Sequence, residues 1–126
     1  MDRNKILQII NDYSLDKSRI IVISGAALVL LNVVEAARDI DIYCDREYYE
    51  YLLKNYNCEF ERTNEFGEKA YMIDGIINFG LSYKPNKIMV VEGLQCASLK
   101  DILDMKKFLN RAKDKAIIKK LELIVK

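Results

Sequence analysis

The sequence predicts an α/β (α+β) domain in which a small mixed sheet has helices packed mainly on one side and is followed by two C-terminal helices. An apolar, β-branched run over residues 20–23 is typical of a buried strand. A segment rich in Ala and Leu, residues 26–34, then indicates a short buried helix, and a second strand is expected over residues 38–44. Strands and helices alternate in this region, and the C-terminal part, about residues 98–126, is expected to be helical. We therefore expect one small mixed sheet and a single domain that spans residues 1–126.

The remaining elements follow from hydrophobic periodicity and from cap residues. Apolar side chains at helical spacing predict a first helix over residues 2–13 and a later one over residues 46–56, for which Asp45 is a suitable N-cap. Ser98, with Asp101 at the third helical position, predicts the start of the C-terminal helices. Further strands are expected over residues 57–61, 69–74, 76–81 and 88–91.

Composition restricts the classes of function. The chain has 126 residues, of which 51% are hydrophobic and 31% charged, as in a soluble globular domain. No apolar run approaches a membrane span, and the N-terminus lacks the apolar core of a signal peptide, so we expect a cytoplasmic protein with no membrane partner. Three widely spaced cysteines without a CxxC pair indicate reduced thiols. The absence of histidine excludes histidine-dependent zinc sites and Ser-His or Cys-His nucleophiles.

Two aspartates on the strand expected over residues 38–44 are the main indication of a site. Successive strand residues point to opposite faces, so Asp39 and Asp41 share one face while Ile40 and Ile42 share the other. Two carboxylates about 7 Å apart on one face repel each other unless positive charge lies between them. Carboxylates are the ligands that Mg²⁺ prefers, so the pair predicts a divalent-cation site. Solvation of both side chains on an edge strand is the alternative.

Charge is unevenly distributed along the chain, whose net charge is +1. Residues 1–99 hold 11 Lys and Arg against 15 Asp and Glu, a balance of −4. Residues 100–126 hold 9 against 4, a balance of +5. A basic C-terminal segment is suited to contact phosphates, and a solvated helix surface explains the same lysines equally well.

Two pairs of motifs resemble a known superfamily. The segment Ser24-Gly25-Ala26-Ala27-Leu28, followed by Asp39-Ile40-Asp41, is similar to the signature of nucleotidyltransferases with the polymerase-β-like fold. In that signature a turn of small residues after the first strand leads into a short helix, and an Asp-x-Asp pair lies on the next strand. Residues 98–106 and 111–114 resemble the C-terminal helical pattern of the minimal nucleotidyltransferases, a group that includes toxins of type IV toxin–antitoxin systems. The resemblance covers about residues 19–120.

The resemblance implies a Mg²⁺- or Mn²⁺-dependent protein that binds an NTP and transfers NMP to a hydroxyl of a protein or an RNA. The implied site residues are Asp39 and Asp41 for catalysis and metal binding, and Ser24, Gly25, Lys106 and Lys113 for the nucleotide. For the two lysines, ordinary helix-surface charge with i,i+3 pairs such as Arg111 with Asp114 is the alternative.

The sequence departs from the family at the third carboxylate, which usually lies on a neighbouring strand and binds the second metal. The matching position is Asn78, whose amide oxygen can bind a metal but cannot act as a general base. Asp74, four residues earlier, shares its strand parity and is the competing catalytic acid. Ala37, Glu35 and Asn32 stand where the family commonly has Thr, Arg and Gly.

These departures support a second hypothesis, a catalytically degenerate nucleotidyltransferase fold. Such a protein acts as a binding protein or inhibitor of another macromolecule, in the manner of an antitoxin-like or phage-encoded protein. A third hypothesis is a nucleic-acid-binding accessory protein that uses the basic C-terminal segment, and its binding would depend strongly on salt.

Overall fold

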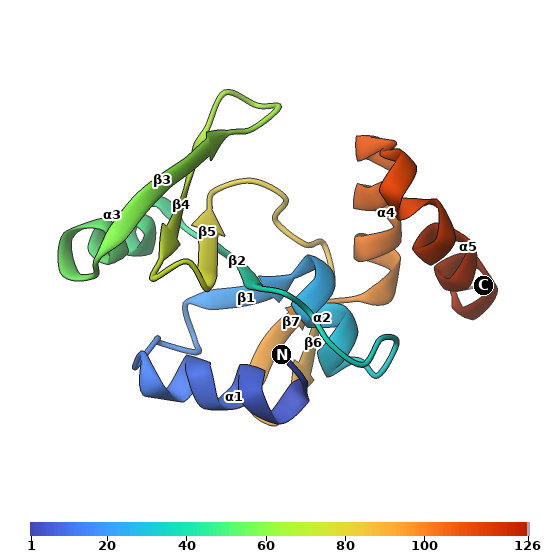
Figure 1. Cartoon of the computed structure of the whole chain (residues 1–126), viewed down its shortest axis with the longest axis horizontal. Helices are drawn as coiled ribbons and strands as arrows, with labels where there is room; N and C mark the ends of the chain where they lie inside the picture. The colour runs from blue at the N-terminus through green and yellow to red at the C-terminus, as the bar shows by residue number, and fades with distance from the viewer. Residues whose placement is uncertain (126) are drawn as a thin grey trace.

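Figure 1 presents the computed structural model of the protein, which describes residues 1–125. These residues form one mixed sheet of seven strands, five α-helices and a short 3₁₀ helix, so the expected mixed α/β class is confirmed. The helices are α1 (Arg3–Asp12), α2 (Ser24–Leu30), α3 (Arg46–Asn55), α4 (Leu99–Leu109), the 3₁₀ helix η1 (Ala112–Asp114) and α5 (Lys115–Ile124). The strands are β1 (Ile20–Ile23), β2 (Ile40–Cys44), β3 (Cys58–Thr63), β4 (Lys69–Ile73), β5 (Ile77–Gly80), β6 (Ile88–Val91) and β7 (Leu94–Ala97).

The strand order places β1 and β2 in the interior of the sheet. The order is β3-β4-β5-β2-β1-β7-β6, with β1 antiparallel to β2, β5 parallel to β2, and β7 parallel to β1. Burial alternates along β2: Ile40, Ile42 and Cys44 are buried, whereas Asp41 and Tyr43 are partly exposed. One face of the sheet is therefore apolar core, and the opposite face carries Asp41.

Helices cover the apolar face. Three isoleucines of α1 are buried, and α2 buries every residue from Ala26 to Leu30. Tyr49 of α3 packs edge-on against Phe79 of β5, with ring centroids 5.6 Å apart. In Figure 1, α1 and α2 lie in the lower part of the view, where β7 and β6 also run, and α4 and α5 form a separate pair at the right. None of the helices formed by residues 1–125 combines the length and hydrophobicity that spanning a membrane requires.

Two expected helix starts are confirmed by their caps. The Asp45 side chain accepts a hydrogen bond from the Tyr48 N–H at 2.9 Å, and α3 begins at the next residue after Asp45. The Ser98 hydroxyl accepts from the Asp101 N–H at 3.2 Å and donates to the Asp101 carboxylate at 2.9 Å. Each cap satisfies an amide that has no partner inside its helix, which contributes roughly 1 kcal/mol. Local sequence signals therefore account for where α3 and α4 begin.

The largest differences from the sequence prediction are at two elements, and strand β2 also begins at Ile40 rather than at residue 38, which leaves Asp39 outside it. Helix α2 begins two residues before the expected range of 26–34 and ends four residues before its end. It stops early because Asn32, with a φ of 63°, adopts a left-handed backbone that a helix cannot continue. Strand β7 has no counterpart in the prediction. It pairs with β6 across a two-residue turn in which Glu92 and Gly93 have φ of 50° and 79°, as type I′ hairpin turns require.

Candidate functional site

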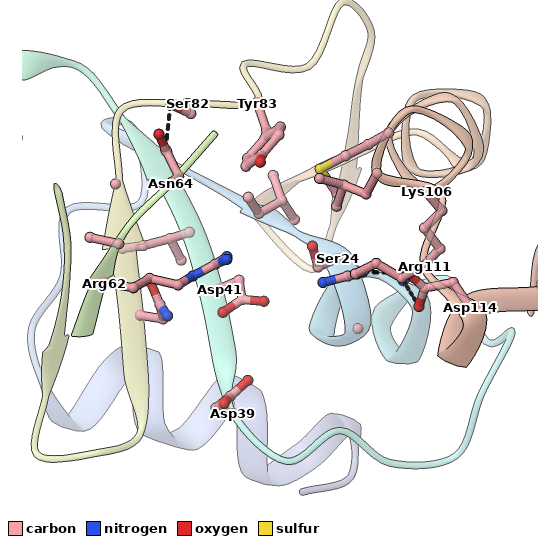
Figure 2. A pocket seen from close by; sticks show the side chains of 18 of the residues that line it. Ser24, Asp39, Asp41, Arg62, Asn64, Ser82, Tyr83, Lys106, Arg111 and Asp114 are labelled. Atoms are coloured by element: carbon pink, nitrogen blue, oxygen red, sulfur yellow. Dashed lines mark hydrogen bonds and ion pairs between the residues drawn. The ribbon is translucent and has the colours of Figure 1, made fainter. Parts of the chain in front are cut away.

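A polar pocket of about 370 Å³ opens on the face of the sheet that carries Asp41. Its sheet-side wall comes from β2, β5 and the turn that begins α2, and its helix-side wall comes from α4 and η1. Figure 2 shows Asp39 and Asp41 on the sheet side, with Lys106, Arg111 and Asp114 opposite them. Seven of the residues singled out in the sequence line this pocket: Ser24, Gly25, Asp39, Asp41, Asn78, Lys106 and Lys113.

The acidic pair lies on the sheet-side wall. Asp41 is opposite Asn78 of β5 in the strand register, and Asp39 lies directly before the first residue of β2. Burial, and then the negative charges of Asp39 and Glu61, raise the pKa of the Asp41 carboxyl to about 7. The Asp39 side chain is 28% exposed, and its carboxylate lies 3.7 Å from Arg38 Nε. Negative charge on this wall is therefore only partly compensated by its neighbours.

The turn between β1 and α2 brings backbone to the same wall. Ser24 has a φ of 55°, in the left-handed region, which a residue other than Gly adopts at a cost of about 1–3 kcal/mol. A Cβ atom added to Gly25 would lie 3.7 Å from the Ala37 Cβ, an ordinary contact, so the fold itself does not require glycine there. The residue before α2, Ile23, provides no side-chain cap. Amides at the start of α2 and the Ser24 hydroxyl are therefore donors at this wall.

The helix-side wall contains a buried ion network. The Asp114 carboxylate lies 3.3 Å from Lys106 Nζ and 2.7 Å from Arg111 Nε. The Lys106 and Asp114 side chains are only 8% and 7% exposed. Burial opposes ionisation of Asp114, but the hydrogen bond from Arg111 and the charge of Lys106 outweigh it and lower the pKa of this carboxyl. Lys106 therefore lines the pocket with its ammonium group already bound to a carboxylate.

Two exposed cations also line the pocket. Arg62 comes from β3 and Lys113 from η1. In the part of the chain that the structure describes, neither makes an ion pair within 4.0 Å. Both are therefore suited to bind an anion from outside, most strongly one that accepts charge-assisted hydrogen bonds.

The structure separates the two residues considered for the third acidic position. Asn78 lines the polar pocket, and its Nδ2 donates a hydrogen bond to Glu61 Oε2 at 2.8 Å. Asp74 does not line the pocket; it is exposed and accepts a hydrogen bond from the Tyr13 hydroxyl at 2.7 Å. The parity expected between Asp74 and Asn78 does not hold, because Asp74 lies in the turn between β4 and β5 with a φ of 51°.

The pocket provides oxygen ligands that could hold one divalent cation bound to a phosphate. Asp39 and Asp41 supply carboxylates, and the Asn78 amide, which donates through its nitrogen, keeps its oxygen available. Mg²⁺ is commonly held by one or two carboxylates together with substrate phosphates and waters, so this set fits it. Among residues 1–125, no three His, Cys, Asp or Glu side chains are arranged to hold a metal by themselves.

Side-chain hydrogen bonds hold the rim of the pocket. Asn64 Nδ2 donates to Ser82 Oγ at 2.8 Å (Figure 2). Ser82 Oγ in turn donates to Glu68 Oε1 at 2.6 Å. The Tyr83 hydroxyl donates to Glu65. Burial and this hydrogen bond raise the pKa of Tyr83 to about 12, so the phenol stays neutral at physiological pH. These contacts tie the turn between β3 and β4 to the loop that follows β5.

Sequence reasoning missed Glu61 and Arg62, which bring opposite charges to the sheet-side wall. The alternation of polar and apolar residues over 57–61 predicts a strand there, but a β-bulge between Phe60 and Arg62 shifts its register against β4. Alternation cannot indicate such a shift, so the sequence offered no signal for where Glu61 would lie. The expected i,i+3 pair of Arg111 with Asp114 is confirmed.

Comparison with known proteins adds no relative. The chain matches no protein-family model, no curated protein and no solved structure. The resemblance to nucleotidyltransferases therefore stays a prediction from the sequence motifs alone.

Proposed function

We propose that the polar pocket binds a complex of Mg²⁺ or Mn²⁺ with an NTP, and that the protein is a minimal nucleotidyltransferase that transfers NMP to a hydroxyl of a protein or an RNA. The observation that carries the proposal is that Asp39, Asp41, the Ser24-Gly25 turn and exposed cations line one pocket although they come from separate segments of the chain. Carboxylates and cations that face the same open pocket suit a ligand that is itself a metal cation bound to phosphates.

The sheet-side wall holds the metal and the phosphates. Asp39 and Asp41, with the Asn78 oxygen, bind the divalent cation, which when bound neutralises phosphate charge. The Ser24 hydroxyl and the amides at the start of α2 donate hydrogen bonds to phosphate oxygens. Binding therefore needs metal and nucleotide together, because two carboxylates without the phosphates leave most of the coordination of Mg²⁺ to water.

Positive charge reaches the nucleotide in two ways. Lys113 and Arg62 are exposed, so their side chains contact phosphates directly. Lys106 acts from a fixed position, because Asp114 holds its ammonium group at 3.3 Å. A hydrogen bond to a charged group contributes about 1.5–3 kcal/mol, so removal of one exposed cation weakens binding without abolishing it.

A specific observation favours a second candidate function, a catalytically degenerate fold that binds another macromolecule. The third acidic position holds Asn78, and Asp74 lies outside the pocket. In two-metal chemistry that position helps to bind the second metal and to accept the proton of the attacking hydroxyl. In this candidate the pocket keeps its nucleotide and metal, the transfer step is absent, and the protein acts as an inhibitor.

The test is incubation of the protein with each α-labelled NTP and Mg²⁺ or Mn²⁺, alone and with a cell extract that supplies protein and RNA acceptors. We expect label transfer that is lost in the double variant Asp39→Asn with Asp41→Asn. The charge-matched control is Asp12→Asn with Glu50→Gln, which removes two exposed carboxylates from α1 and α3.

Calorimetry on the same variants separates the two candidates. Metal-dependent NTP binding without any label transfer selects the catalytically degenerate fold. Unchanged metal and NTP binding in the Asp39→Asn, Asp41→Asn variant rejects the assignment of the pocket under both.

A further inference from the structure

A second, aromatic hollow adjoins the polar pocket. It has a volume of about 260 Å³. Ile23, Tyr83 and Met105 line both the hollow and the polar pocket, so the two share a wall. Figure 2 shows the Tyr83 side chain at the upper edge of the polar pocket, and the same residue also lines the aromatic hollow.

Three aromatic rings from distant segments meet at this hollow. Phe66 lies in the turn between β3 and β4, Tyr83 in the loop after β5, and Phe108 near the end of α4. The rings of Phe66 and Phe108 are nearly parallel, 9° apart, with centroids separated by 5.9 Å. Tyr83 meets Phe66 edge-on, with centroids 5.6 Å apart. Contacts between segments so far apart in the sequence form a defined surface rather than isolated exposed rings.

The two stacked rings remain largely exposed. Phe66 is 55% and Phe108 63% exposed, although each contacts the other. A folded chain normally buries the faces of its phenylalanines, and a cluster of exposed rings marks a place where an apolar ligand surface is expected. The open faces are flat, so a planar ring system fits them better than a branched aliphatic group does.

We propose that the aromatic hollow holds the nucleobase of the NTP whose phosphates occupy the polar pocket. This inference rests on the proposed function. A nucleotide joins a flat, largely apolar base to a charged phosphate chain, and the two adjoining cavities repeat that order. Because the base is held by stacking, every base offers a suitable face, and the protein discriminates weakly among the four NTPs.

The experiment compares an NTP with inorganic tripolyphosphate, each titrated calorimetrically in the presence of Mg²⁺ into wild type and Phe108→Ala. Stacking of one base on an aromatic side chain predicts that Phe108→Ala weakens binding of the NTP by roughly 5- to 100-fold. Binding of tripolyphosphate should be unchanged, because that ligand has no base. Phe108→Leu, which keeps apolar area but removes the flat ring, should weaken NTP binding as well.

The chain offers a matched control in Phe60→Ala. Phe60 is 56% exposed, lies on β3, where it contacts Tyr71, and lines neither cavity, so its loss should change the affinity for neither ligand. Because Phe108 is also well exposed, its substitution should leave the fold intact, which a melting temperature checks.

Each other outcome is decisive. If wild type binds tripolyphosphate but Phe108→Ala leaves the affinity for the NTP unchanged, the base lies elsewhere and the inference is overturned while the proposed function stands. Equal weakening of both ligands by Phe108→Ala also overturns it, because the ring would then act through the polar pocket. If wild type binds neither ligand, the proposed function fails and the base site fails with it.

Discussion

Each wall of the polar pocket carries an aspartate whose pKa is shifted, and the two shifts have opposite directions. On the helix-side wall, Asp114 has Lys106 and Arg111 within 3.3 Å, and its pKa is lowered. On the sheet-side wall, burial and the charge of Asp39 raise the pKa of Asp41 to about 7. A carboxylate with its partners already present stabilises the fold, whereas one without them gains its partner from a ligand. Within one cavity, Asp114 therefore stabilises the fold, whereas Asp41 is left available for a ligand.

The two aspartates change stability in opposite directions as pH rises. An unfolded Asp titrates near pH 4. Folded Asp41 keeps its proton up to about pH 7, whereas unfolded Asp41 loses it near pH 4. The contribution of Asp41 to the free energy of unfolding therefore falls as pH rises from about 4 to about 7. Folded Asp114 prefers the ionised form, so its contribution is present above about pH 4 and is lost as pH falls through its lowered pKa. Together the two groups favour folding most near pH 4.

The largest expected effect is on the helix-side wall. Asp114→Asn leaves the buried ammonium of Lys106 without a counter-charge, and we expect it to lower the free energy of unfolding by about 3–5 kcal/mol in urea titrations. The control is Asp104→Asn, which breaks an exposed pair with Lys100 and should cost at most about 0.5 kcal/mol. Adding Lys106→Met to Asp114→Asn should recover part of the loss. Equal losses in Asp114→Asn and the control would falsify the structural role of the network.

On the sheet-side wall, removal of an aspartate is expected to raise the free energy of unfolding instead of lowering it. Asp41→Asn removes a carboxyl that the fold disfavours as an anion, so it should raise the free energy of unfolding of the metal-free protein by about 1–2 kcal/mol at pH 8. The gain should shrink toward pH 5, because wild-type Asp41 is then protonated. Thermal unfolding of both proteins across this pH range measures it. A lower melting temperature for Asp41→Asn at pH 8 would mean that the carboxylate is structurally bonded and that the two walls do not differ.

A third effect concerns the position opposite Asp41. Asn78→Asp adds a carboxylate to the sheet-side wall, so we expect it to raise the affinity for Mg²⁺ roughly tenfold in calorimetry and to create or increase label transfer. The added charge lies beside Glu61, so the metal-free variant should melt below wild type. Asp74→Ala and Asn78→Ala belong in the same series. Loss of label transfer in Asp74→Ala but not in Asn78→Ala would assign the third acid to Asp74.

The comparison also indicates which features a sequence can predict. Caps and alternation are local, so Asp45 and Ser98 indicated where helices begin, and the alternation after Asp39 indicated which side chains of β2 share a face. The motif from Ser24 to Asp41 likewise forms one wall of the pocket from elements that follow one another directly in the chain. These features depend on interactions within a few residues, which the sequence displays directly.

Features that depend on distant segments were not predictable. The burial of Lys106 requires Asp114, eight residues further on, to turn back through η1. The place of Glu61 depends on a β-bulge, and the separation of Asp74 from the pocket depends on a left-handed turn. Hydrophobic periodicity carries no information on either, because a bulge or a turn residue alters register without altering the pattern. Both walls of the pocket therefore contain features that local sequence signals could not predict.

The smallest expected effect tests whether the sheet-side wall stores strain as well as charge. Ser24 has a φ of 55° at the edge of the polar pocket, and Ser14 has a φ of 54° directly after the C-cap of α1. Glycine removes the steric cost of the left-handed backbone but adds freedom to the unfolded chain, so each Ser→Gly change should raise stability by a net of about 0.5–1 kcal/mol.

The two variants should diverge in ligand binding, because only Ser24 lines the pocket. Ser24→Gly removes a hydroxyl donor and should weaken Mg²⁺-dependent NTP binding by severalfold, the worth of one hydrogen bond of about 1 kcal/mol. Ser14→Gly should bind as wild type does. If Ser24→Gly is less stable than wild type while Ser14→Gly is more stable, the Ser24 backbone is held by its own side chain, and the strain does not belong to the site. If both variants bind the NTP equally, the hydroxyl does not contact the phosphates, and the turn acts through its backbone amides alone.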